Sequence, residues 1–191
     1  MTAPLETAAR RDLYALTARL FVAEVDVALY RALAAQEALG LIDAELSAMG
    51  EERALEALAV EFCRLFVGPQ PRCVPYASAH RGEALLGGRA RTRLEAFLCR
   101  VGFTFDEVAM RIASPDHLAV ELAVLAHLYA LTDTADTVRE FLYDHVLPWA
   151  PAYCEQVAAA AALGFYRTTA RLVAALLAEE EPSGKANSRP G

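Results

Sequence analysis

The stretch that decides the fold is SPDHLAVELAVLAHLYAL, at positions 114–131. Ser114 is a candidate N-cap, Pro115 is tolerated in a first helical turn, and Asp116 lies where a negative charge suits the helix dipole. Behind these start signals, large apolar residues recur on one helical face at Leu118, Leu122, Leu125 and Tyr129. The pattern predicts a helix that is buried on most of its sides.

This helix has few polar side chains, which are therefore candidates for function. His117 and Glu121 are one turn apart and share a flank, whereas Asp116 points elsewhere from the same end. A His and a Glu at this spacing could supply two metal ligands. No Glu lies three residues before any of the four histidines, so the Glu-x-x-His signature of helical di-iron proteins is absent. A metal site is an alternative that rests on one pair of ligands.

The composition favours an all-α protein. Of the 191 residues, 55% are hydrophobic and 23% are charged, Ala and Leu dominate, and runs of β-branched residues are scarce. This length suits one hydrophobic core. We expect a single-domain helical bundle over 1–180, followed by a disordered tail, EPSGKANSRPG, at 181–191.

Periodic apolar residues predict a series of helices separated by turn signals. One long helix or two abutting helices are expected at 5–33, one begins after Pro148, and the others are expected at 41–49, 51–67, 89–101, 114–131, 135–146 and 165–178. Between Gly68 and Gly82, three prolines and the lack of a helical period predict an ordered surface loop. This Pro-rich loop follows the third or fourth predicted helix.

Charge and cysteine content disfavour several classes of protein. The net charge of -7 disfavours binding to nucleic acid, and the acidic balance of 112–164, with Arg139 as its one basic residue, suits a basic ligand. The four cysteines form no CxxC pair, so inert thiols are expected. Without a secretory signal pattern or a membrane-spanning apolar run, the protein is expected to be cytoplasmic and not stably inserted in a membrane.

Motifs for catalysis are absent from the sequence. There is no nucleophile elbow, zinc-protease motif, phosphate loop or dinucleotide fingerprint, so we expect neither enzymatic activity nor a cofactor. Cys73, Ser78 and His80 lie in one loop and could form a nucleophile with its base, but hydrogen bonds that order the loop explain them more simply. The sequence therefore favours a function in binding.

A second apolar stripe, Phe62, Leu65 and Phe66, ends against the Pro-rich loop. Such a stripe is ordinarily part of a core. If the loop carrying Tyr76 and the helix start carrying Asp116 converge on it, they form a groove with aromatic walls and an acidic rim. A groove of this kind suits an amphipathic or basic peptide.

Four segments resemble one known family. They are EFCRLFVGP at 61–69, VPYASAH at 74–80, PDHLAVEL at 115–122 and HVLPW at 145–149. In this order and at these separations they resemble the TorD/DmsD family of redox-enzyme maturation chaperones, which are molybdoenzyme assembly proteins. The resemblance covers most of the chain from about residue 50 to 165.

The resemblance implies an all-helical cytoplasmic chaperone that binds the twin-arginine signal peptide and the apo form of a molybdoenzyme catalytic subunit. Such a protein delays export until the molybdopterin cofactor is inserted. Because a helical domain with exposed hydrophobic segments can exchange helices, we expect a monomer or a domain-swapped dimer. The resemblance implies a peptide-binding surface formed by Leu65, Phe66, Pro75, Tyr76, Asp116 and His117, with Ser78 and Glu121 as weaker additions.

Two departures from the family pattern and two other classes of protein qualify this interpretation. The family often has an acidic residue where this chain has Ala113-Ser114, and an aromatic residue where it has His80. One alternative is a small helical metal-binding protein or enzyme that uses His117 and Glu121. The other is a helical transcription regulator, which is disfavoured because no N-terminal helix pair carries a basic recognition face.

Overall fold

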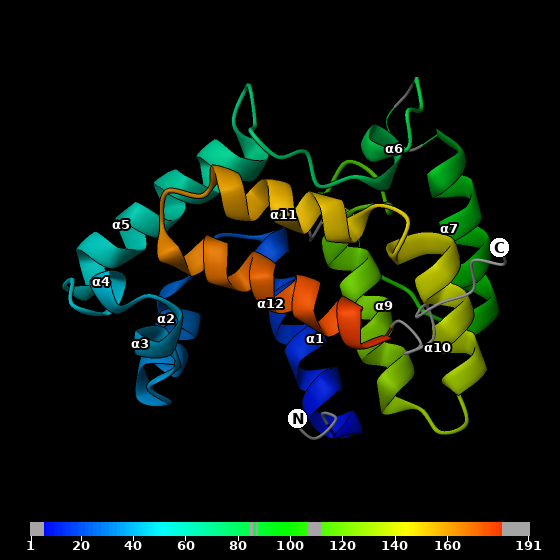
Figure 1. The fold of residues 1–191 in the computed structure, drawn as a ribbon, viewed down its shortest axis with the longest axis horizontal. Coiled ribbons are helices and arrows are strands. Elements are labelled where there is room, and N and C mark those ends of the chain that lie inside the picture. Colours follow the sequence, from blue (N-terminus) through cyan, green and yellow to red (C-terminus); the bar gives the residue numbers. More distant parts are fainter. Residues whose placement is uncertain (1–5, 85, 87, 107–111, 181–191) are drawn as a thin grey trace, which may run out of the picture.

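The structure, a computed structural model, describes residues 6–84, 86, 88–106 and 112–180. Helix α9 (Leu118–Ala130) lies at its centre, and nine of its thirteen residues are buried. Because apolar residues occupy nearly every side of α9, neighbours can cover it all round. Its main partner is α1 (Thr7–Val22), which packs along it (Figure 1).

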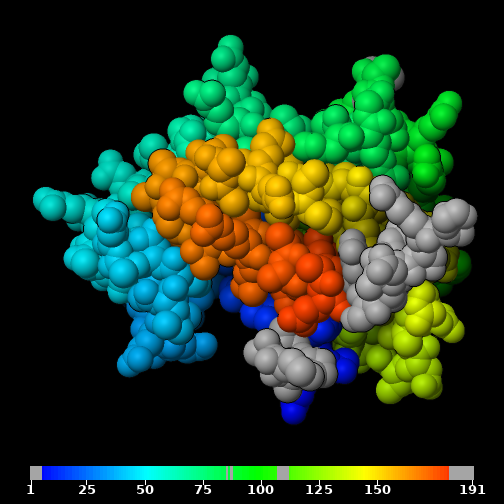
Figure 2. All heavy atoms as spheres, in the orientation of Figure 1, coloured from blue at the N-terminus to red at the C-terminus, as the bar shows by residue number. Residues whose placement is uncertain are grey.

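The other helices surround this central pair. Two of them, α11 (Ala150–Ala160) and α12 (Gly164–Glu180), form a hairpin that packs against α1 through α12. The hairpin lies between two end groups (Figure 1), one made of α2 (Val27–Ala35), α3 (Ala38–Ile42), α4 (Ala44–Ser47) and α5 (Glu51–Phe62), the other including α7 (Gly88–Val101) and α10 (Ala135–Phe141). Figure 2 shows the hairpin filling the middle of this face, with a notch between α12 and the α2–α3 segment.

The helices enclose one continuous cluster of buried hydrophobic side chains. Within the described residues there is no strand, only an isolated bridge between Tyr76 and His117. The predicted all-α class is therefore confirmed. Among the described helices, none has the length and apolar character needed to cross a membrane. The tail predicted at 181–191 lies outside the described residues.

Two of the predicted helices are divided in the structure. The stretch 5–33 divides into α1 and α2, because Ala23 is extended and the Asp26 carboxylate caps the start of α2. The helix predicted at 41–49 corresponds to α3 and α4, which are separated at Asp43, the N-cap of α4. If α3 and α4 are counted as the one short helix predicted there, the Pro-rich loop follows the fourth helix.

Ser114 is not the N-cap of α9 that the sequence predicts. The helix begins four residues later, and its N-cap is His117, whose Nδ1 accepts a hydrogen bond from the Ala119 amide at 3.0 Å. The preceding residues stay out of the helix because their backbone pairs with the Pro-rich loop, where the Ala77 amide donates to the Asp116 carbonyl at 2.8 Å. The buried Ser114 hydroxyl has no hydrogen-bond partner among the described residues.

Two π-helical turns, η1 (Cys63–Val67) and η2 (Leu142–Val146), extend α5 and α10. At the end of η1, the Gly68 amide donates to the first carbonyl of the turn at 2.7 Å. Because the helix ends there, the Leu65 carbonyl is available to the returning loop and accepts a hydrogen bond from the Cys73 amide at 2.9 Å. The turn thus ties the Pro-rich loop to the end of α5.

Carboxylates fix the α11–α12 hairpin to the rest of the fold. Glu61 accepts a hydrogen bond from the Ala162 amide at 2.6 Å and is held by Arg64 through two bonds of 2.7 Å. At the start of α12, Asp43 accepts from the Phe165 amide at 2.8 Å. Both carboxylates satisfy amides at a helix end or turn that would otherwise lack partners.

The geometry of η1 yields a prediction about Gly68. A Cβ atom there would lie 2.9 Å from the Cys63 carbonyl oxygen, whereas one at Gly50 would meet nothing within 4 Å. Because φ is negative at both glycines, alanine can adopt the native backbone at either position, and the two changes reduce the conformational entropy of the unfolded chain by a similar amount. We expect Gly68→Ala to lower the free energy of unfolding by about 1–3 kcal/mol in urea titrations. Gly50→Ala is the control, and equal effects of the two changes would contradict the account.

Candidate peptide-binding groove

A groove of about 530 Å³ opens where the end of α1, the end of α5 with η1, and the Pro-rich loop meet. Its floor is aromatic and consists of Phe21, Phe62 and Phe66. One wall comes from distant parts of the chain and consists of Pro75, Tyr76 and His117. The remaining lining residues lie at the end of α1, in the α1–α2 turn or around the floor: Arg19, Val22, Ala23, Glu24, Val67 and Ile112.

The floor is a set of aromatic rings in mutual contact. Phe62 and Phe66 share a face because they are four residues apart, and their ring centroids lie 5.2 Å apart. Phe66 also meets Phe21 at 5.5 Å and Tyr166 at 5.7 Å in edge-on arrangements. These contacts hold the three floor rings in place at the base of the groove, where each is 6% exposed or less.

The wall depends on the pairing of the Pro-rich loop with the residues that precede α9. The Leu118 amide donates to the Pro75 carbonyl at 2.9 Å, which completes the antiparallel bridge between Tyr76 and His117. The rings of these two residues meet edge-on with their centroids 5.0 Å apart. The Tyr76 hydroxyl accepts a hydrogen bond from the Ala113 amide at 3.0 Å, so both rings are fixed.

Asp116 lies behind this wall and does not reach the groove. Its side chain is 0% exposed, and Oδ2 accepts a hydrogen bond from the Ser78 amide at 2.8 Å, at the start of the short helix α6 (Ala77–His80). Its Oδ1 has no hydrogen-bond partner among the described residues. A ligand can reach this carboxylate only if the pairing between the loop and the start of α9 opens.

His117 and Glu121 have separate partners. Burial lowers the pKa of His117 to about 4, which agrees with a neutral ring whose Nδ1 caps α9. Glu121 is 1% exposed, and its carboxyl accepts a hydrogen bond from the Trp149 indole at 3.0 Å. Burial raises the pKa of Glu121 well above its usual range. Across the described part of the chain, no group of three or more His, Cys, Asp or Glu side chains is placed to hold a metal ion.

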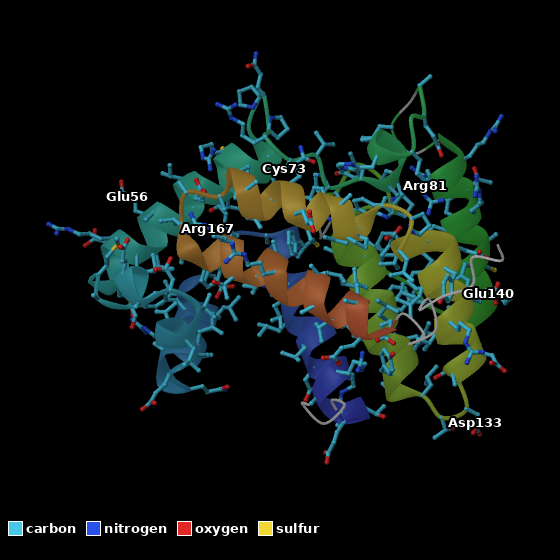
Figure 3. The ribbon with its side chains drawn as sticks, in the orientation of Figure 1. Glu56, Cys73, Arg81, Asp133, Glu140 and Arg167 are labelled. Carbon is cyan, nitrogen blue, oxygen red and sulfur yellow. The ribbon has the colours of Figure 1, made fainter. Side chains whose placement is uncertain are left out.

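The second half of the Pro-rich loop is fixed against the segment before α11. The His80 ring stacks on Trp149 with centroids 5.3 Å apart, so an imidazole supplies an aromatic contact at this position. The Arg81 guanidinium, labelled in Figure 3, donates to the carbonyls of Asp144 and His145, both at 2.8 Å. Arg81 thereby joins the end of the loop to η2.

The local nucleophile considered from the sequence has little access to solvent. Ser78 and Cys73 are both buried, and burial raises the pKa of the Cys73 thiol. His80 uses its Nε2 in a 2.8 Å hydrogen bond with the Val74 carbonyl. These contacts order the loop, as the simpler interpretation predicts.

Four of the eight residues implied by the family resemblance line the groove: Phe66, Pro75, Tyr76 and His117. The other four are buried behind them: Leu65, Ser78, Asp116 and Glu121. Sequence reasoning missed the contribution of the end of α1, which carries Arg19, and of the α1–α2 turn, which carries Glu24. The available signal was the polar interruption AEVD at 23–26, within a stretch interpreted as scaffold.

Comparison with known proteins agrees with this architecture. Residues 8–155 match the nitrate reductase delta subunit family. Chaperone protein TorD of Vibrio cholerae is 28% identical over 158 residues, which cover 76% of this chain and 70% of that protein. Chaperone protein TorD of Shewanella piezotolerans is 30% identical over 196 residues, covering 87% of this chain and 88% of that protein.

A solved structure shares the fold. It is a protein from Archaeoglobus fulgidus described as a redox enzyme maturation protein, with a TM-score of 0.57 and 23% identity, and the match covers 93% of this chain and 96% of that one. At this identity the likeness concerns the fold alone. The sequence matches go further, and they show that the chain belongs to the nitrate reductase delta subunit family and to its TorD-type redox-enzyme maturation chaperones.

Proposed function

We propose that the protein is a cytoplasmic chaperone for a molybdopterin oxidoreductase. It binds the twin-arginine signal peptide and the apo form of the catalytic subunit, assists insertion of the cofactor and delays export. The observation that carries the proposal is the aromatic-floored groove, because every residue of its floor and wall except Phe21 comes from three of the segments that resemble the family.

The groove has the physical properties that a signal peptide needs. Such a leader combines a basic twin-arginine pair with an apolar stretch, and an apolar stretch gains free energy when it covers the apolar side chains that the groove leaves accessible, above all Val67, which is 65% exposed. A volume of about 530 Å³ is in the range of sites that enclose several side chains. Delaying export requires only competition with the export machinery, for which micromolar affinity, about -8 kcal/mol, is sufficient.

The eight residues of the family surface have two kinds of role in this proposal. Phe66, Pro75, Tyr76 and His117 line the groove and contact the leader. The buried group keeps that lining in position, as when Asp116 holds the amide of Ser78 and Glu121 holds Trp149. Replacing a residue of the second group therefore changes binding through the shape of the groove.

Val67 offers a direct test of leader binding in the groove. It is 65% exposed and lines the groove, whereas Val60, also 65% exposed, lies earlier on the same continuous helix and does not line it. Threonine keeps the shape of valine but places a hydroxyl against the bound apolar segment. We expect Val67→Thr to weaken binding of a twin-arginine leader about fivefold in calorimetric titrations.

Val60→Thr is the matched control for this change and should leave the affinity unaltered. Both variants should keep the circular dichroism spectrum and melting temperature of the original protein, because both positions face solvent. Equal affinities for the two variants would show that the leader binds elsewhere.

The buried His117 yields a prediction about pH. Its pKa is about 4 in the folded protein and about 6.5 when unfolded, so between these values the unfolded chain binds more protons and stability falls as pH falls. The loss attributable to His117 between pH 6.5 and pH 4 is about 3 kcal/mol. His117→Asn keeps an N-cap acceptor for α9 but does not titrate, so it should lose less stability in urea titrations from pH 7 to pH 4.5.

His145 contributes the same dependence to both proteins, because burial also lowers its pKa to about 4. The informative quantity is therefore the difference between the original protein and His117→Asn. His127→Asn, on the same helix, controls for replacing a histidine as such. Parallel stability curves for the original protein and His117→Asn would refute a buried neutral imidazole.

A further inference from the structure

Because Asp116 is buried, another carboxylate must meet the basic part of a ligand. The α1–α2 turn supplies a candidate, Glu24. Glu24 lines the groove and is exposed. No described residue donates a hydrogen bond to its carboxylate. The side chain therefore presents to the groove a carboxylate that no described side chain pairs with.

The other charges at this turn neutralise each other. Arg19 donates to the Asp26 carboxylate at 2.7 Å and, through its second terminal nitrogen, to the carbonyls of Ala23 and Glu24, both at 3.1 Å. The remaining Asp26 oxygen accepts from the Leu29 amide at 2.8 Å and caps α2. The turn thus has two carboxylates and one guanidinium, and its backbone is held in place by Arg19.

The charge of Glu24 acts on Tyr166, a residue that packs against the floor. Burial and, after it, the charge of Glu24 raise the pKa of Tyr166, whose ring meets Phe66 edge-on at 5.7 Å. An acidic group and an apolar surface are therefore adjacent. A ligand with a basic residue beside an apolar segment matches this arrangement.

We infer that Glu24 is a specificity-determining residue of the groove and pairs with a guanidinium of the twin-arginine motif while the apolar segment of the leader covers the floor. The inference deepens the proposed function and rests on it. Arginine suits the site better than lysine because its planar fork can donate two parallel hydrogen bonds to one carboxylate. The contacts of Arg19 show that oxygen atoms of this turn already satisfy one guanidinium.

The experiment measures binding of a twin-arginine leader and its twin-lysine variant by calorimetry. The proteins are the original chain, Glu24→Gln, Glu24→Asp and Glu56→Gln. Glu56, labelled in Figure 3, is the control because it is an exposed acid of α5 that does not line the groove. The Glu56→Gln substitution removes the same unit of negative charge as Glu24→Gln without changing the α1–α2 turn.

The original protein should bind the twin-arginine leader about tenfold more tightly than the twin-lysine leader. Glu24→Gln should lose about tenfold in affinity for the twin-arginine leader and most of the preference, since an amide cannot form the charged pair. Glu24→Asp should keep the preference, and Glu56→Gln should match the original protein.

Two results would overturn the inference in different ways. If Glu24→Gln keeps the original preference, or if Glu56→Gln loses as much, Glu24 does not recognise arginine and the proposed function stands. If the original protein binds neither leader, the proposed function is wrong and the inference falls with it.

Discussion

The groove depends on one backbone pairing, in which residues 75–77 of the Pro-rich loop lie antiparallel to residues 116–118. The pairing delays the start of α9 to Leu118 and places the rings of Tyr76 and His117 together. The Asp116 side chain adds a further link between the two segments, because its Oδ2 accepts a hydrogen bond from the Ser78 amide in a fully buried position. Loop and central helix therefore form one wall.

The rest of the fold keeps both sides of that pairing in position. On one side, η1 brings Cys73 back to the Leu65 carbonyl. On the other, α9 is fixed because apolar neighbours cover almost all of it. A binding surface supported in this way is largely formed before a ligand arrives, which lowers the entropy cost of association.

Much of this fold follows from local sequence, and the exceptions have a common cause. Apolar periodicity locates most helices, because it reports which face is buried. Local rules predict Ser114 as the N-cap, but a backbone pairing with the Pro-rich loop, about 40 residues earlier in the chain, moves the helix start to Leu118. For the same reason, a family motif identifies Asp116 but does not reveal that the side chain is buried. The α1–α2 turn with Glu24 is far from the other groove residues in sequence, and only folding brings it to the groove.

Amide hydrogen exchange with and without a twin-arginine leader tests the central claim that this groove is the binding surface. The account predicts slower exchange at the α1–α2 turn, in η1 and in the paired segments 75–77 and 116–118, with α7 and α10 unchanged. Protection confined to α7 and α10, or leader binding without protection around the groove, would contradict it.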